Sequence, residues 1–202
     1  SFHDAKAHVD SNGVQINNLS GTGLQVTSAT VNNSTAAGVS VQNSSADINF
    51  DDLSITSAGT TGLAIRNNSG ALEINDTLSI TNSAQEGLLI DSNNATATFE
   101  VNGVTTINNA TQASVAIQNN DSSVTFADVT LLNRNGEGID IDNSSGAMTF
   151  NDILIATPAS GAFDGINVTG NTGNGTTTIN SVTISDSGAN GIVLDNLGDT
   201  ST

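Results

Sequence analysis

The sequence predicts an all-β solenoid, a single-stranded parallel β-helix in which one chain winds into stacked coils. Three observations support this fold: a repeat of about 25 residues, short apolar-x-apolar blocks inside each repeat, and no sustained helical periodicity. The 202 residues are expected to form one solenoid domain over 1–202, with about 8 coils and three short strands per coil. A unit of this size cannot bury an apolar face alone, so each coil depends on its neighbours.

The first block of each repeat is a glycine followed by an apolar-x-apolar triplet. Its first copy is Gly13-Val14-Gln15-Ile16, and later copies follow at intervals of 24 to 27 residues. In the fifth copy, Ser114 stands where the other copies have glycine. Alternation of apolar and polar residues predicts a strand with one buried face. The expected inward row comprises Val14, Val39, Leu63, Leu88, Val115, Ile139, Ile166 and Ile192.

Two further blocks complete each repeat. In residues 62–86 they are Leu72-Glu73-Ile74 and Leu78-Ser79-Ile80, and the gaps hold Asn, Ser, Gly and Asp, which favour turns. Each block again predicts a short strand with one inward face. The second inward row comprises Phe50, Ile74, Phe99, Phe126, Phe150 and Ile179. The third comprises Ile55, Ile80, Ile107, Leu131, Ile155 and Ile184.

Both ends of the chain have the pattern of partial coils. Residues 2–7 fit the template of residues 50–55, and the chain stops shortly after a first-block strand. Solenoids need polar caps to stay monomeric, and neither end has an obvious one. We therefore expect a segment of a longer repeat protein, whose ends stack on flanking repeats or on another copy, end to end.

The charge of the chain limits the class of partner. Twenty Asp and Glu residues against 3 Lys and Arg residues give a net charge of −17. Such a surface repels nucleic-acid phosphates and anionic membranes, and no apolar run approaches the roughly 18 residues of a membrane span. We expect no nucleic-acid partner and no direct membrane insertion. Because the chain has no cysteine, disulfides and thiolate metal sites are excluded.

The repeats resemble the right-handed parallel β-helix repeats of secreted bacterial surface proteins: autotransporter passengers, large repetitive adhesins and pectate-lyase-like folds. The resemblance covers residues 2–197 and implies an extracellular or cell-surface location. With the general preference for right-handed crossovers, it implies a right-handed coil. It also implies a structural ladder of stacked asparagines after the first strand. That position holds Asn43, Asn67, Asn119, Asn143 and Asn196.

Asp140 and Asp142 are the candidates for catalysis. They share the outer face of a first-block strand, and glycosidases use two carboxylates roughly 5–9 Å apart. The chain lacks the Gly-His-Gly and Arg-x-Lys features of the polysaccharide-cutting enzymes that it resembles, and it has no Tyr or Trp for sugar stacking. We therefore interpret the pair as part of a solvated face and expect no enzyme activity.

Four acidic residues, Asp52, Asp76, Asp128 and Asp152, recur in the turn between the second and third blocks. Asp52 is expected to stack on Asp76, and Asp128 on Asp152, in adjacent coils. Turn capping through backbone N–H groups is the simpler role. Bridging of adjacent coils by Ca²⁺ is the alternative, although the nonapeptide Ca²⁺ repeat is absent. No other cofactor is expected.

The sequence therefore favours a structural or adhesive segment of a large bacterial cell-surface or filament-forming protein, without catalysis. Its receptor would be a glycan or a protein. The alternative is a glycan-binding or polysaccharide-degrading β-helix of the lyase, hydrolase or phage-tailspike type. The longer loop 157–164, with Phe163, is where a β-helix would place a binding feature.

Overall fold

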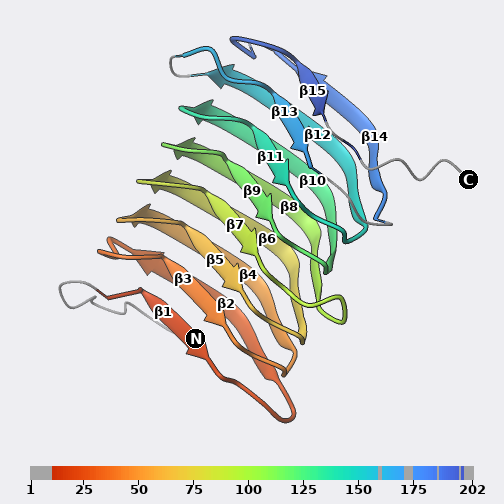
Figure 1. Ribbon diagram of the computed structural model, residues 1–202. Helices are drawn as coiled ribbons and strands as arrows, with labels where there is room; N and C mark the ends of the chain where they lie inside the picture. Colours follow the sequence, from red (N-terminus) through yellow and green to blue (C-terminus); the bar gives the residue numbers. More distant parts are fainter. Residues whose placement is uncertain (1–10, 159–160, 171–174, 186, 196, 198–202) are drawn as a thin grey trace, which may run out of the picture.

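The protein is an all-β parallel solenoid of about seven turns, with roughly 25 residues per turn. Its structure is a computed structural model that describes residues 11–158, 161–170, 175–185, 187–195 and 197. Figure 1 shows the coils stacked in sequence order from the N-terminus to the C-terminus. The described residues contain no helix of any kind, and so none that could cross a membrane.

The first block of each repeat forms a short strand, and these strands build an eight-stranded parallel sheet. Each has its first-row residue opposite that of the next coil, for example Val14 opposite Val39 and Ile139 opposite Ile166. The predicted first row is therefore confirmed over its whole length. The strands are β1 (Val14–Asn17), β3 (Val39–Gln42), β5 (Leu63–Arg66), β7 (Leu88–Asp91), β9 (Val115–Gln118), β11 (Ile139–Asp142), β13 (Ile166–Thr169) and β15 (Ile192–Asp195).

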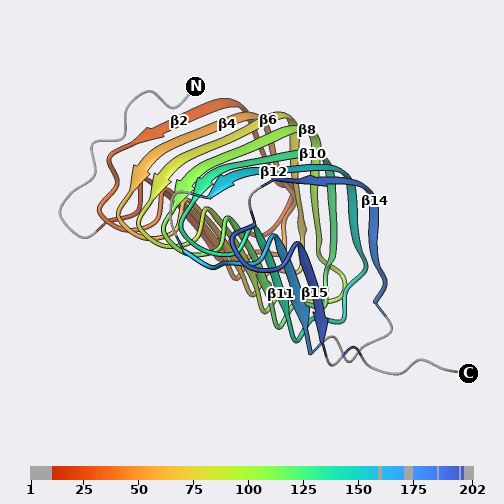
Figure 2. The same cartoon turned by 90° about the horizontal axis from the view of Figure 1, so that it is seen from above.

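The second and third blocks run together as one long strand in each coil, so a coil has one short and one long strand. The long strands form a seven-stranded parallel sheet, which makes a separate wall of the column when it is viewed along the axis in Figure 2. They are β2 (Leu24–Asn32), β4 (Ile48–Ala58), β6 (Ala71–Ser83), β8 (Thr98–Ala110), β10 (Ser123–Arg134), β12 (Met148–Pro158) and β14 (Thr177–Ile184).

A corner in each long strand explains why the sequence shows two blocks. In β4 the side chains alternate between inward and outward as far as Phe50. Asp51 and Asp52 then both lie outside the core, and the alternation begins again at Leu53. The corresponding corner in β6 has one more residue, and the pairing register between the two strands shifts there as in a β-bulge. The strand pairing thus continues across the corner, while the positions that point inward shift along the sequence.

The third predicted row is confirmed, but the second contains an error. Ile55 pairs with Ile80, and Leu131 pairs with Ile107 and Ile155. Phe99 does not occupy the row of Phe50, because Val101 does; Phe99 lies opposite Leu72 instead. Its ring nevertheless contacts Phe126 edge-on, with centroids 5.5 Å apart.

The interior is a single continuous apolar cluster of the aliphatic and phenylalanine rows. Val39, Leu63, Leu88, Ile139 and Ile155 each have 0% exposure. Burying such a side chain contributes roughly 1.5–3 kcal/mol, and only the stacking of coils achieves that burial.

The glycines that open six of the short strands make room both for a β-branched side chain of the same coil and for a carbonyl oxygen of the next coil; they are Gly13, Gly38, Gly62, Gly87, Gly138 and Gly165. A Cβ on Gly62 would collide with Cγ2 of Ile80, and one on Gly87 with Cγ2 of Ile107. In the coil of Ser114, the residue of the third inward row, which holds Ile80 and Ile107 in the two preceding coils, is Leu131. Leucine branches at Cγ and carries no Cγ2. The one coil that opens on serine thus has leucine where the neighbouring coils have isoleucine.

Candidate functional site

Asp140 and Asp142 both lie on β11, as expected, and point away from the core. Asp140 is half-buried and Asp142 is exposed. Each carboxylate accepts a hydrogen bond from the next coil: Asn167 Nδ2 donates to Asp140 Oδ1 at 2.9 Å, and Thr169 Oγ1 donates to Asp142 Oδ1 at 3.1 Å. The two acids therefore join β11 to β13.

The environment of Asp140 opposes its ionisation. Burial raises the pKa of this carboxyl above its ordinary value, and the charges of Glu137 and Asp142 raise it further, while the hydrogen bond from Asn167 lowers it. A desolvated carboxylate near like charges is stabilised by any positive charge that approaches it. The chemistry of the Asp140 carboxyl therefore differs from that of a freely solvated side chain.

Asp140 lines a groove of about 330 Å³ on the side of the column. Two alanines make its floor, Ala113 and Ala116, which are 5% and 1% exposed and belong to a small apolar cluster separate from the core. Phe163, from the loop before β13, also lines the groove. The other lining residues are Glu86, Thr111, Gln112, Gln118, Asn135, Gly136 and Glu137.

The hollow arises because one coil carries alanine at two neighbouring rows. The residue before the short-strand glycine is Glu86 in one coil, Ala113 in the next and Glu137 in the third, as the backbone hydrogen bonds from Gly87 and Ser114 show. On the outer face of the short strands, Ala116 lies between Leu89 and Asp140 in the same way. Larger side chains above and below therefore enclose the space over the alanines.

A buried arginine anchors the loop that carries Phe163. Arg134 is 0% exposed and donates from Nη1 to the carbonyl oxygens of Gly136 at 2.8 Å and Asp164 at 3.0 Å, and from Nη2 to that of Ser187 at 3.0 Å. Burial lowers the pKa of Arg134, and the charges of Glu137 and Asp164 oppose this effect. These bonds join three successive coils beside the groove.

The four predicted turn acids are all exposed at the corners of the long strands. Asp128 and Asp152 are partners between β10 and β12, as expected. Asp52 does not stack on Asp76; it pairs with Thr77, because the extra residue in the β6 corner shifts the register. The described residues contain no group of three or more His, Cys, Asp and Glu side chains placed to hold a metal ion.

The predicted asparagine positions lie at the end of the short strands, where the chain turns. Asn43, Asn67, Asn119 and Asn143 have φ between 46° and 54°, the left-handed region that asparagine tolerates better than most residues. Asn143 Nδ2 donates to Asn119 Oδ1 at 2.7 Å. Asn196 lies outside the described residues.

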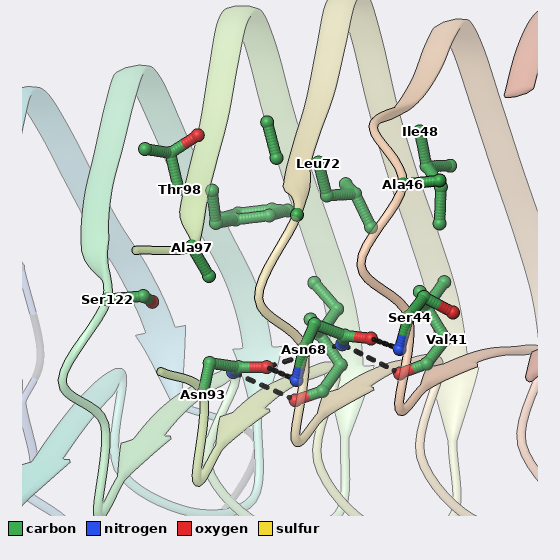
Figure 3. Close-up of a pocket in the computed structure, with 14 residues that line it drawn as sticks. Val41, Ser44, Ala46, Ile48, Asn68, Leu72, Asn93, Ala97, Thr98 and Ser122 are labelled. Carbon is green, nitrogen blue, oxygen red and sulfur yellow. Dashed lines mark hydrogen bonds between the residues drawn. The ribbon is translucent and has the colours of Figure 1, made fainter. Parts of the chain in front are cut away.

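A second polar row, one residue further along the chain, was missed by the sequence analysis. We call it the inner polar row; it comprises Ser44, Asn68, Asn93, Asn120 and Ser144, all at most 5% exposed. Figure 3 shows its first part, where the backbone N of Ser44 donates to Asn68 Oδ1 and the backbone N of Asn68 donates to Asn93 Oδ1, both at 2.9 Å.

The inner polar row satisfies buried backbone groups in the turn. Asn68 Nδ2 donates to the carbonyl oxygen of Val41 at 3.1 Å, and Asn93 Nδ2 donates to that of Ile65 at 3.3 Å. Beside the row lies a cavity of only about 10 Å³, near the lower limit for one water molecule. The row is therefore structural, and the doublets Asn67-Asn68 and Asn119-Asn120 are its signal in the sequence.

Comparisons with known proteins add no assignment. No protein-family model matches this chain, and no curated protein or solved structure matches it either.

Proposed function

We propose that this chain is a structural, adhesive segment of a large extracellular or cell-surface repeat protein. The column supplies length and a repetitive acidic side wall, and it carries out no reaction. The parallel solenoid supports this proposal, as does the resemblance of its repeats to those of secreted bacterial surface proteins. A net charge of −17 favours solubility of such an exposed wall.

The hydrogen bonding of Asp140 and Asp142 carries the proposal. These carboxylates are the strongest catalytic candidates in the sequence, and each accepts a bond from the side chain directly above it in the next coil. A general acid or base must reach a substrate proton at hydrogen-bond distance. Here the bonds are made along the column, which is the role expected of a structural wall.

Stacking on further coils, of the same protein or of another copy, is part of this proposal. The inward rows continue to β15, where Ile192 and Leu194 are 45% and 62% exposed. At the other end, the apolar side chains of β1 and β2 line a hollow of about 510 Å³. One more coil on either side would bury these rows in the way that every internal coil does.

A glycan-active β-helix is the second candidate, and one observation favours it. The structure places Phe163 in the same groove as Asp140, so an aromatic ring and a carboxyl with a raised pKa face one space. Such a combination suits a sugar ring in polysaccharide-binding or polysaccharide-cutting proteins.

Incubation of the purified chain with neutral and acidic polysaccharides separates the two candidates. The structural proposal predicts no new reducing or unsaturated ends from either the native chain or Asp140→Asn. It also predicts that beads coated with the native chain adhere to glycan- or protein-coated surfaces better than beads coated with Ile139→Asp, whose core is broken. New ends produced by the native chain and lost in Asp140→Asn would overturn it and establish the second candidate.

A further inference from the structure

We propose that the groove over Ala113 and Ala116 binds an organic cation, the ammonium or guanidinium end of a basic side chain. The groove combines an apolar floor, one aromatic wall and three carboxylates, from Glu86, Glu137 and Asp140. No lysine or arginine is among its described lining residues. This inference assigns a ligand class to the side wall and does not depend on whether the column has a structural role.

The positions of the two glutamates suit a single positive charge between them. Glu86 and Glu137 occupy the same row two coils apart, with Ala113 between. Since parallel strands are spaced about 4.8 Å apart, a cation above Ala113 would lie roughly 5 Å along the axis from the backbone of each glutamate, within reach of both side chains. Opposite charges at that separation attract appreciably in a partly desolvated site.

Phe163 supplies the apolar contact for the stem of such a side chain. The four other described phenylalanines, Phe50, Phe99, Phe126 and Phe150, are at most 1% exposed, whereas Phe163 is only half-buried. Its backbone is fixed by a parallel bridge to Gly188 and by a hydrogen bond that its carbonyl oxygen accepts from the N–H of Ala189 at 3.2 Å. An aromatic face next to carboxylates attracts a cation and also packs against its methylene groups.

Asp140 adds a carboxylate whose ionised form a cation would stabilise. Desolvation and the charges of Glu137 and Asp142 oppose its ionisation, and a positive charge in the groove reverses that effect. One of its oxygens already accepts from Asn167, which fixes the carboxyl at the groove wall. An acidic polysaccharide would instead meet three like charges, so the electrostatics favour a basic ligand.

Titration calorimetry with a tetralysine peptide at low salt tests the proposal. The native chain should bind with saturable 1:1 stoichiometry, and Glu137→Gln should weaken binding about fivefold, the upper range for a solvent-accessible ion pair. The matched control is Asp152→Asn, which removes the same charge from an exposed position outside the groove and should change affinity less than about twofold by the same reasoning.

A second pair of variants tests the hollow itself at constant charge. Ala116→Leu fills the floor and should abolish tetralysine binding. Ala64→Leu, on the same outer row two coils earlier, should leave it intact. Circular dichroism and melting curves establish that each variant is folded.

Equal weakening of tetralysine binding by Glu137→Gln and Asp152→Asn would show diffuse attraction to an acidic rod and overturn the proposal. Binding of neutral cellotetraose, but not tetralysine, would also overturn it.

Discussion

At the residue scale, the glycine before each short strand is matched to the side chain that packs against it. Gly38, Gly62 and Gly87 leave space for Cγ2 of an isoleucine in their own coil. Ser114 occurs where the corresponding residue is Leu131. Because protein interiors are close-packed, the two positions form one packing unit, and a change at one requires a change at the other.

This pairing predicts a compensated double substitution. Gly62→Ser should lower the free energy of unfolding by about 1–3 kcal/mol, the usual cost of overpacking, since its Cβ would collide with Ile80 Cγ2 and with the carbonyl oxygen of Gly87. Gly62→Ser combined with Ile80→Leu should recover part of that loss, because the collision with Cγ2 is removed and the one with the carbonyl oxygen remains. Urea denaturation of the native chain, both single variants and the double variant measures the coupling. Additive effects of the two substitutions would refute the pairing.

At the element scale, the turn after each short strand is held by the inner polar row. Asn93 is 3% exposed; its Oδ1 accepts from the backbone N of Asn68 and its Nδ2 donates to Ile65 and Asn120. Buried backbone groups that lose such partners are costly. The row therefore determines how tightly β5, β7 and β9 can stack at their carboxyl ends.

Substitution of Asn93 should destabilise the column far more than substitution of its exposed neighbour. Asn93→Leu leaves the backbone N–H of Asn68 and the carbonyl of Ile65 without these partners, and we expect a loss of about 2–4 kcal/mol, since each unsatisfied buried group costs roughly 1–3 kcal/mol. Asn94→Leu, at an exposed position, is the matched control. Comparable melting temperatures for the two variants would show that the inner polar row contributes little.

The sequence was sufficient for two of the three inward rows. The first row could be read directly, because each of its residues comes immediately after the opening glycine or Ser114. The third row lies 17 to 20 positions after the opening residue, and it could be read because each third block ends on isoleucine or leucine. Phe99 was misplaced because it lies nine positions after Ile90, whereas its partner Leu72 lies seven positions after Ile65, so the turn before Phe99 has two additional residues. The inner polar row was missed because asparagine and serine in a turn resemble generic turn formers.

At the scale of the whole molecule, the candidate groove depends on contacts that no local pattern records. Asp140 was identified as a candidate, and the loop of Phe163 as a possible binding feature, but their meeting in one groove requires the loop to return over a neighbouring coil. Arg134 fixes that return through carbonyl groups of three coils. Such long-range bonds follow from the stacking, and only the assembled column shows them.

The stacking itself is the basis of both proposals. The short strands run in register from β1 to β15, and each long strand between β2 and β14 pairs with the one before and the one after it. A continuous column of this kind places Glu86, Ala113 and Glu137 in one row and makes the side wall repetitive. If the coils were out of register, neither the groove nor the wall would exist.

Disulfide trapping tests this register most directly, because the chain has no cysteine of its own. Gln42 and Arg66 are partners in adjacent coils, whereas Gln42 and Asp91 are two coils apart in the same row. Disulfides need Cα atoms within about 7 Å, and coil spacing of about 4.8 Å satisfies this only for neighbours. Gln42→Cys with Arg66→Cys should crosslink rapidly on mild oxidation, and Gln42→Cys with Asp91→Cys should not. A crosslink in the second pair and none in the first would contradict the parallel column.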